Sequence, residues 1–414
     1  MAAYTTKLFT SPQEINAIAG AWNELRQRQP HPELKLHPEW LLHRTRWQTN
    51  SRMAVVALYD GRALVGVVPF VLQPWTWACR FAYARVINFP VRRADLCGET
   101  LLAPDDPAAH DAIFKALVGT GLPCDMIFLE ALPTDSRLWR AVQESPIVRG
   151  ALWLYAPKSP GPHWFIRLPE TLEAYLGKFS GKTRQTLQYK VRRLEKRATA
   201  PVRVERITAP EQVPAFLAHV ARVSSLSWQG RRLQKQVSAS EATRAYFTEL
   251  AERGWLRSYL LLSGSQGIAF VVGMQADGVY YYDEPGYDPA WASYSPGAVM
   301  LYRLLEDLFA HHRPQWFDFG SGDLEYKRFY GNECVEAVNV YLLRRSAYMG
   351  LARMAHRSLT AVEDLLRRSV NRLGIRSTVV QLLRRGSAGS DRARSDRSSA
   401  QPLPRGHGDN GSVT

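Results

Sequence analysis

The sequence lacks the cysteine patterns that mark a disulfide framework or a metal site. Its four cysteines form no C-x-x-C pair and have no histidines at metal-ligand spacing, so we expect free thiols in a reducing compartment. No basic segment followed by an apolar block stands at the start, which argues against a secretory signal. The most apolar stretches, such as ALVGVVPFVLQPW, are shorter than the ~20 residues that cross a bilayer. We therefore predict a cytoplasmic protein without a bound metal.

Acidic residues are in the minority, and the basic excess is confined to two segments. The formal net charge is +15 over 414 residues. Residues 178–206 carry ten basic and two acidic side chains, and residues 346–414 carry twelve and five. These two net charges, +8 and +7, account for the whole excess, so the rest of the chain is balanced. Because the charge is local, nucleic acid is not an expected partner of the chain as a whole.

The length and the order of the elements predict a duplicated α/β unit. Proline and glycine in APKSPGPHW, residues 156–164, mark a linker. Helix and strand signals follow in the same order on both sides, including a hairpin across Asp60-Gly61 in the first half. We expect an α/β fold on a mixed sheet, with domains over residues 1–160 and 161–345. A basic amphipathic helical segment then covers residues 346–385, and residues 386–414 form a disordered tail.

The stretch SYSPGAVMLYRLLEDLF joins a tyrosine-rich strand to a long amphipathic helix. The first N–H groups of a helix have no acceptor within it, and its N-terminus attracts anions. We predict a phosphate site with backbone donors at Ser295, Gly297, Ala298 and Val299, where Pro296 sets the turn. The matching N-terminal junction, LLAPDDPAAHDAIF, carries two aspartates that repel phosphate, so the first half is a scaffold or substrate wall. A stiff corner without a ligand is the alternative.

Three blocks resemble a known family: FSGKTRQTLQYKVRRLE, GYDPAWASYSPGAVML and FDFGSGDLEYKRFYG. With the order helix–helix–three strands–helix–strand–helix–strand, they resemble the CelD-like, cellulose-biosynthesis-type branch of the GNAT acetyltransferases, which is related to the FemAB peptidyltransferases. The resemblance covers residues 164–344 and extends to the first half as a degenerate copy. It implies tandem GNAT-like units with the cofactor site in the C-terminal one. The usual phosphate loop, Arg/Gln-x-x-Gly-x-Gly/Ala, is absent.

The resemblance implies transfer of an acetyl or acyl group from acetyl-CoA to an amine or a hydroxyl, in polysaccharide or cell-envelope metabolism. Such a reaction needs a donor for the developing oxyanion and an acid for the leaving thiolate. We place the oxyanion donor near residues 282–284. In DLEYKRFYG we choose Tyr326 as the acid over Tyr330. For both tyrosines, packing alone is the alternative.

The acceptor must also lose a proton, and we choose two carboxylates as candidate bases. Asp318 lies inside FDFG between two phenylalanines and should face away from them, and Glu284 ends YYYDEPG. A turn partner for the GSGD loop is the alternative for Asp318, and the role of Glu284 is open. Asp323 is better explained as the N-cap of LEYKRF.

Basic side chains supply candidate anion contacts. We assign Lys327 and Arg328 to the adenosine phosphates. The substrate-binding candidates are Lys182, Arg184, Tyr282 and Asp283. Lys190 and Arg193 belong to the same basic block as Lys182, which gathers an anionic substrate or the CoA phosphates, or is a solvated helix face.

Two other functions compete with acetyl transfer to a small-molecule or saccharide acceptor. One is FemAB-like transfer from aminoacyl-tRNA, in which both basic regions contact the RNA backbone. The other is a non-catalytic binding or scaffold protein with a GNAT shell. The basic C-terminal segment is either a solvated helix or a peripheral contact with an acidic membrane surface or a partner protein.

Overall fold

The computed structural model describes residues 4–30, 32–48, 50–81, 84–119, 122–226 and 239–372. These residues form two compact units. Unit 1 contains the described parts of Met1–Leu25 and Thr49–Pro160, with residues 338–372; unit 2 contains those of Arg26–Gln48 and Gly161–Ala337. The division after Pro160 coincides with the expected linker. Two segments differ from the predicted ranges. Residues 26–48 belong to unit 2, although they lie within the predicted range 1–160. Residues 338–345 belong to unit 1, although they lie within the predicted range 161–345.

Unit 1 is built on a mixed sheet in the order β1-β2-β3-β4-β5-β13, with β6 also paired to β13. Neighbouring strands are antiparallel except the parallel pair β4 and β5. The strands are β1 (Tyr4–Phe9), β2 (Arg52–Asp60), β3 (Ala63–Phe81), β4 (Ala84–Leu96), β5 (Met126–Pro133), β6 (Leu152–Tyr155) and β13 (Glu333–Arg344). The helices are α1 (Pro12–Gln27), α3 (Pro107–Val118), α4 (Arg137–Glu144), α5 (Pro146–Ala151) and α13 (Ala347–Arg372). The expected hairpin across Asp60-Gly61 joins β2 to β3.

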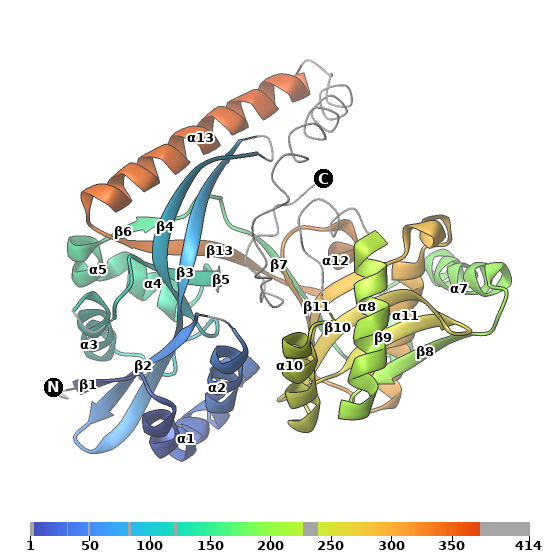
Figure 1. Ribbon diagram of the computed structural model, residues 1–414, viewed down its shortest axis with the longest axis horizontal. Coiled ribbons are helices and arrows are strands. Elements are labelled where there is room, and N and C mark those ends of the chain that lie inside the picture. Colours follow the sequence, from blue (N-terminus) through green and yellow to red (C-terminus); the bar gives the residue numbers. More distant parts are fainter. Residues whose placement is uncertain are drawn as a thin grey trace. The chain divides into compact units, whose positions relative to one another are not determined.

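Strand alternation gives unit 1 its core. Val56, Phe70 and Ile113 belong to one buried cluster, in which strands of the sheet meet α3. A second cluster covers the long β3–β4 hairpin, where Trp77 and Phe89 pack against the start of α13. Figure 1 shows α13 lying along this hairpin. The described part of the predicted basic segment is therefore a helix; residues 373–385 and the predicted tail 386–414 lie outside the described residues.

The strands of unit 2 continue from β13 in the order β13-β7-β12-β11-β10-β9-β8, and among these described pairs only β11 and β12 are parallel. Its further strands are β7 (Gly161–Arg167), β8 (Val202–Ile207), β9 (Ser258–Ser263), β10 (Gln266–Ala276), β11 (Val279–Tyr287) and β12 (Trp316–Ser321). The α-helices are α2 (Pro38–Trp47), α6 (Leu172–Leu176), α7 (Gly181–Arg197), α8 (Val213–Leu226), α10 (Glu241–Glu252), α11 (Pro296–Ala310) and α12 (Glu325–Tyr330). The 3₁₀ helices are η1 (Leu34–Leu36), η2 (Pro210–Gln212) and η3 (Pro289–Tyr294).

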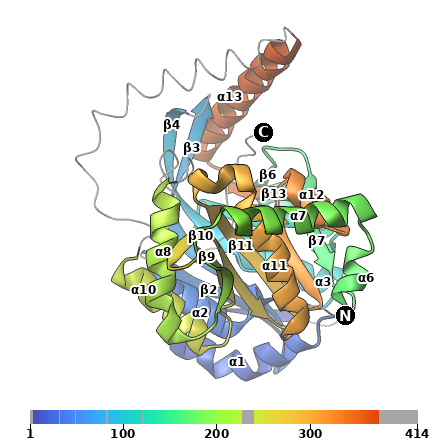
Figure 2. The same cartoon turned by 90° about the vertical axis from the view of Figure 1, so that its right-hand side faces the viewer.

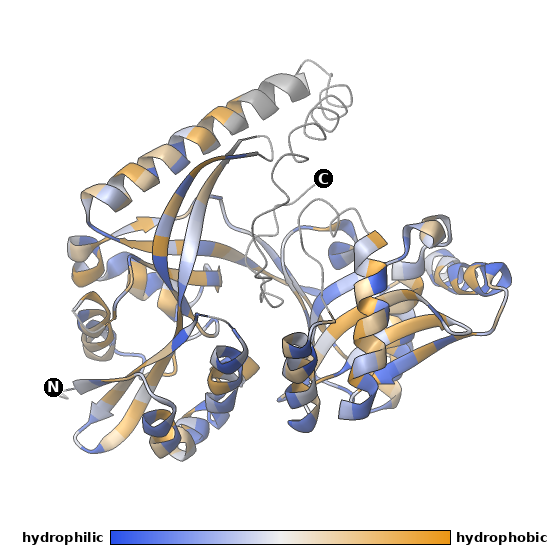
Figure 3. Ribbon diagram, viewed as in Figure 1, coloured by the Kyte–Doolittle hydropathy of each residue, from blue (hydrophilic) through white to orange (hydrophobic). Residues whose placement is uncertain are grey.

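Helices cover both faces of the unit 2 sheet, and successive strand residues serve opposite faces. Tyr259 and Leu261 of β9 pack in the cluster that contains α7 and α11. Leu260 of the same strand packs in the cluster that contains α8 and α10. Figure 2 shows these helix pairs on the two sides of the strands, and Figure 3 shows the strands as predominantly apolar. The predicted mixed α/β fold is thus confirmed. Helix α10 begins at a serine N-cap, because Ser240 accepts the Thr243 N–H.

The segment 26–48 completes the α8–α10 face of unit 2. Leu34 and Trp40 are buried in that cluster. Glu249 of α10 accepts hydrogen bonds from Trp47 Nε1 at 2.6 Å and from Arg253, and it lies 3.1 Å from His43 Nδ1. Burial by itself raises the pKa of Glu249, but the hydrogen bonds from Trp47, Arg253 and His43 outweigh it and lower the pKa to about 2. This carboxylate therefore fastens α2 to α10.

Candidate active site

The parallel strands β11 and β12 separate toward their carboxyl ends. Their register begins at Val279 with Trp316 and ends at Tyr281 with Asp318, although β11 continues to Tyr287. On its other side β11 bulges, because the register with β10 jumps at Asp283. A diverging strand with a bulge presents main-chain groups that no neighbouring strand of the ladder takes up. An opening between β11 and β12 therefore lies next to residues 282–284, where we placed the oxyanion donor.

The helix that follows this opening starts in the predicted way, but fewer amides point outward than expected. Ser295 has a left-handed backbone (φ 56°), and its N–H donates to the Ala292 carbonyl at 3.1 Å. The Val299 N–H donates to the Ser295 carbonyl at 3.1 Å. Pro296 has no N–H, so Gly297 and Ala298 supply the amides that the first turn leaves without an acceptor inside the helix. A β-carbon at Gly297 would contact only Tyr287, at an ordinary 3.7 Å.

Two arginines of α7 lie against the residues that lead into this helix start. The Arg193 guanidinium is 5.3 Å from the ring centre of Tyr294, and that of Arg197 is 5.6 Å from Trp291. Both aromatic residues belong to η3, directly before Ser295. Arg193 was a predicted anion contact, whereas Arg197 was not named among them. A spacing of four residues places both on one face of the helix. Positive charge is therefore concentrated beside the two outward-pointing amides.

The predicted substrate residues of α7 lie elsewhere on the helix. Lys182 is exposed in its first turn, about 16 Å along the axis from Arg193. Arg184 lines a cavity of about 240 Å³ with Gln188 of the same helix and Tyr302 of α11. Tyr282, by contrast, is buried at the opening between β11 and β12, and Asp283 and Glu284 are half-buried next to it on β11. The structure therefore separates the two α7 residues from the arginines at η3.

Tyr326 lies beside the point at which the strands part. Its ring centre is 6.3 Å from that of Tyr282 on β11 and 5.9 Å from that of Phe319 on β12. Burial raises the pKa of Tyr326 well above its usual value, so the phenol keeps its proton at neutral pH. Tyr330 is buried one turn further, and its hydroxyl has no hydrogen-bond partner among the described residues. The side chain of Lys178 holds the end of α12 through the carbonyls of residues 329–331.

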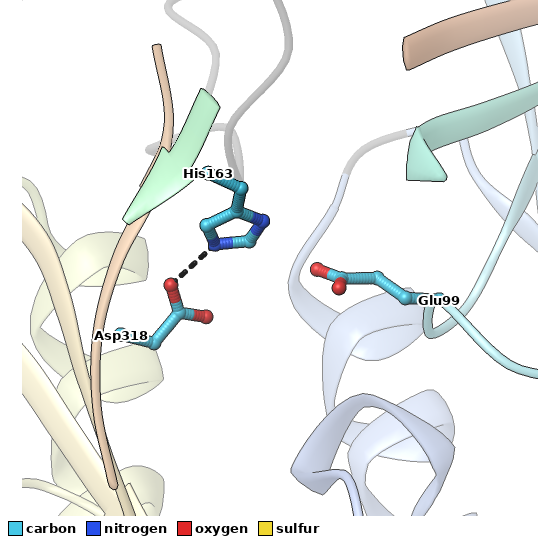
Figure 4. Close-up of side chains that lie close together, drawn as sticks. All are labelled: Glu99, His163 and Asp318. Carbon is cyan, nitrogen blue, oxygen red and sulfur yellow. Dashed lines mark hydrogen bonds and ion pairs between the residues drawn. The ribbon is translucent and has the colours of Figure 1, made fainter. Parts of the chain in front are cut away.

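Asp318 forms a tight pair with His163, a residue that sequence analysis missed. His163 Nε2 and Asp318 Oδ1 are 2.6 Å apart, as Figure 4 shows, and the same oxygen accepts the Gly320 N–H at 2.6 Å. Burial raises the pKa of Asp318, but the charge and hydrogen bond of His163 outweigh it, so the pKa is lowered. Asp318 therefore holds the turn that follows it, as the alternative interpretation predicted, and it also pairs with His163. Only the antiparallel pairing of β7 with β12 brings His163 to this carboxylate.

The basic residues of α12 occupy different environments. Lys327 is only 2% exposed, and its ammonium donates to the Gly320 and Ser321 carbonyls at 3.1 and 2.8 Å. Burial lowers its pKa to about 8. Lys327 thus holds the loop after β12, and we do not retain it as a phosphate ligand. Arg328 is exposed and pairs with Asp323 at 2.5 Å. The prediction that Asp323 caps α12 is wrong, because the N-cap is Leu324, without a side-chain hydrogen bond.

The corresponding helix start in unit 1 already holds a carboxylate. Asp106 caps α3 by accepting the Ala109 N–H at 2.9 Å, and the Tyr4 hydroxyl donates to its other oxygen at 2.8 Å. This anion occupies the place where a phosphate would bind at a helix N-terminus. The geometry agrees with the assignment of the anion site to the other helix start, at α11.

Comparisons with known proteins match a part of the chain that holds most of the residues described above. Residues 181–328 match the family model described as the acetyltransferase (GNAT) domain. This part of the chain is similar to GNAT acetyltransferases. The matched range contains α7, η3, α11, β11 and β12, and it includes Tyr326 and Asp318. No curated protein matches the chain.

Solved structures resemble a larger part of the chain. FemX aligns with a TM-score of 0.56 and 12% identity over 84% of this chain and 100% of FemX. A conserved protein of unknown function from Bacteroides thetaiotaomicron VPI-5482 aligns with a TM-score of 0.50 and 11% identity, covering 82% and 100%. A tandem GNAT protein from the clavulanic acid biosynthesis pathway gives 0.47 and 11%, covering 82% and 99%. At such identities the likeness to FemX and to the Bacteroides thetaiotaomicron protein concerns the fold alone.

Proposed function

We propose that the protein is a GNAT-type acyltransferase that moves an acetyl or acyl group from acetyl-CoA to an amine or a hydroxyl. One observation carries the proposal: β11 and β12 part beyond Tyr281 and Asp318, directly before the helix start at Pro296. An extended thioester arm fits such an opening, because the bulged edge of β11 offers main-chain groups for its amides. The helix start lies on the path of the attached phosphates.

The donor is held by groups of opposite charge and by the backbone. The Gly297 and Ala298 amides bind the pyrophosphate, while Ser295, Pro296 and Val299 fix the turn that aims them. Arg193 and Arg197 contact phosphate oxygens beside η3, and a guanidinium suits that geometry. Arg328 is a further exposed cation near the end of the opening.

The chemistry uses one proton donor and one proton acceptor. Acetyl-CoA supplies a thioester carbonyl whose oxygen gains negative charge during attack, and a main-chain N–H at the β11 bulge stabilises that charge. Tyr326 keeps its proton at neutral pH and donates it to the leaving sulfur. His163, oriented by Asp318, accepts the proton of the attacking amine or hydroxyl. Glu284 and Asp283, next to the opening, orient the acceptor, which is a small molecule or a saccharide.

Calorimetric titration with acetyl-CoA tests the donor site. We expect the wild-type protein and Gly297→Ala to bind at micromolar concentration, because alanine keeps the amide and meets only Tyr287 at a normal distance. Gly297→Trp should abolish binding by filling the space at the helix start. Circular dichroism and the melting temperature of both variants serve as folding controls. Equal binding by Gly297→Trp and wild type would place the cofactor elsewhere.

A second donor, aminoacyl-tRNA, is favoured by the basic surface of α7 and by the resemblance to FemAB enzymes. The two donors predict opposite results. An aminoacyl-tRNA enzyme would bind tRNA with a steep salt dependence and show no affinity for acetyl-CoA. A protein that binds neither donor would instead be a scaffold. The proposal of acetyl-CoA includes a role in cell-envelope or polysaccharide metabolism, which rests on the CelD-like resemblance.

A further inference from the structure

Helix α13 of unit 1 has two apolar faces, and among the residues that the structure describes only one of them is packed. On the inner face, Met349 and Ala352 are buried with Trp77 on the β3–β4 hairpin. His356 Nδ1 lies 2.8 Å from the Tyr155 hydroxyl on the same side. These contacts seat the inner face of the helix on unit 1. Its other apolar residues therefore need a separate explanation.

The outer face carries a stripe of exposed apolar side chains. Leu351 is 56% exposed, Met354 62%, Val362 46% and Leu365 65%. Their spacings of three, eight and three residues keep them on one side of a 3.6-residue helix. The stripe runs about 21 Å along α13, and Figure 3 shows apolar residues recurring in the coloured part of this helix. Single exposed apolar residues are common, but a continuous row indicates an interaction surface.

Arginines accompany the stripe. Arg357 is exposed on its flank, and Arg353 lies over the Trp153 ring at 4.5 Å. In its sequence, α13 carries five arginines against two acidic residues: Arg353, Arg357, Arg367, Arg368 and Arg372 against Glu363 and Asp364. The partner of this face must therefore be both apolar and anionic.

The β3–β4 hairpin extends the same character beyond the helix. It lies along α13 in Figures 1 and 2. Near its tip, Val86 is 54% exposed and Ile87 40%, and the adjacent Arg85 is exposed as well. Two elements of unit 1 thus combine exposed aliphatic side chains with neighbouring arginines.

We propose that this outer face of α13, made of Leu351, Met354, Val362 and Leu365 with the arginines of the helix, docks on an anionic lipid bilayer. A helix with aliphatic residues on one face and arginines beside them is the pattern that lies in the headgroup region. Anionic lipids attract such arginines. No described helix is long and apolar enough to span a membrane, so the contact is peripheral. The inference is independent of the chemistry in unit 2.

Vesicle co-sedimentation of the full chain tests this surface. We expect the wild type to bind phosphatidylcholine vesicles that contain roughly a quarter phosphatidylglycerol, and to bind pure phosphatidylcholine at least tenfold more weakly. Leu351→Gln/Met354→Gln/Val362→Gln should lose at least tenfold in binding to the anionic vesicles. Arg357→Gln should bind the anionic vesicles about fivefold more weakly, because it removes one positive charge near the lipid surface. The matched control is Tyr189→Gln on α7, whose side chain is 55% exposed outside the surface; it should bind like wild type.

The folding control is the melting temperature, which should be unchanged because all substituted side chains are exposed. Wild-type protein that ignores anionic vesicles overturns the proposal, as does a triple variant that binds them as well as wild type. A third outcome is a wild-type protein that is dimeric and does not bind vesicles, with a triple variant that is monomeric. This result would assign the stripe to self-association instead.

Discussion

The two tyrosines of α12 differ in the surroundings of their side chains. Tyr326 lies half-buried at the strand opening, next to Tyr282, while Tyr330 is fully buried with a hydroxyl that lacks a partner among the described residues. The sequence placed both on one helix face and favoured Tyr326 through the family resemblance. Their environments therefore differ: the Tyr326 ring lies beside the opening between β11 and β12, and the Tyr330 ring is packed in the core.

Tyr326→Phe should lower kcat by about 100-fold or more, because it removes the proposed acid and keeps the ring in place. KM for acetyl-CoA and the melting temperature should stay near the wild-type values. Tyr330→Phe is the matched control: its activity should be unchanged, and its stability equal or higher by up to ~1 kcal/mol, since it removes a buried hydroxyl without a partner. Similar kcat losses in both variants would mean that the ring environment, not the Tyr326 hydroxyl, matters.

Asp318→Asn tests the pair with His163. The substitution keeps the shape of the side chain but removes the charge that orients the imidazole and stabilises its protonated form. We expect kcat to fall about 100-fold or more with little change in acetyl-CoA affinity, and the rate to depend on pH differently from wild type. His163→Gln should give a loss of the same order. An Asp318→Asn enzyme with a wild-type pH–rate profile would leave Asp318 with only its bond to the Gly320 N–H.

At the scale of elements, local signals located the helix starts and the short strands but not the long hairpin. Ser240 caps α10 as expected, and Gly254 has the positive φ (70°) expected where that helix stops. Strand β4 was missed, and β3 runs further than its apolar pattern indicated. Pro74 and Pro90 interrupt the alternation within this hairpin, and its distal half is stabilised by α13, which is remote in sequence.

The junction between α2 and α10 should respond to acid. The pKa of Glu249 is about 2 in the folded protein and about 4.3 when unfolded, so its contribution to stability is present above that unfolded value and is lost as pH falls toward 2. Glu249→Gln should lower stability at neutral pH and flatten the pH dependence between about 5 and 2. Hydrogen exchange of α2 measured across this range checks the effect. An exchange profile that is the same in both proteins would show that Glu249 does not fasten α2.

At the scale of the whole molecule, the two units exchange segments of chain. Residues 26–48 leave the N-terminal half to cover a face of unit 2, and β13 passes from unit 2 at Ala337 to unit 1 at Val338. A duplicated unit with one boundary, as predicted from the repeating order, would have kept each half separate. Periodicity detects an element and its apolar face, but it does not say which sheet that face covers.

Trp40→Ala should therefore destabilise unit 2, although Trp40 lies far in sequence from the helices α8 and α10 with which it packs. Truncating a buried tryptophan costs about 3–5 kcal/mol, and the loss should appear as faster hydrogen exchange in α8 and α10. Tyr189→Ala is the exposed control on α7 and should leave the exchange of α8 and α10 unchanged. Faster exchange confined to segments of unit 1 would contradict the assignment of Trp40 to unit 2.

The sequence by itself determined the fold class, the linker near Pro160 and the strand–helix corner at Ser295, and it singled out Tyr326 and Asp318 as candidates. These features depend on local periodicity, turn chemistry and a family pattern within one stretch of chain. Only the tertiary structure decided that His163 meets Asp318, that Arg197 stands beside η3, and that Lys327 is buried rather than open to phosphate. The physical reason is that strand pairing and helix packing join residues far apart in the chain, and local patterns do not encode which ones meet.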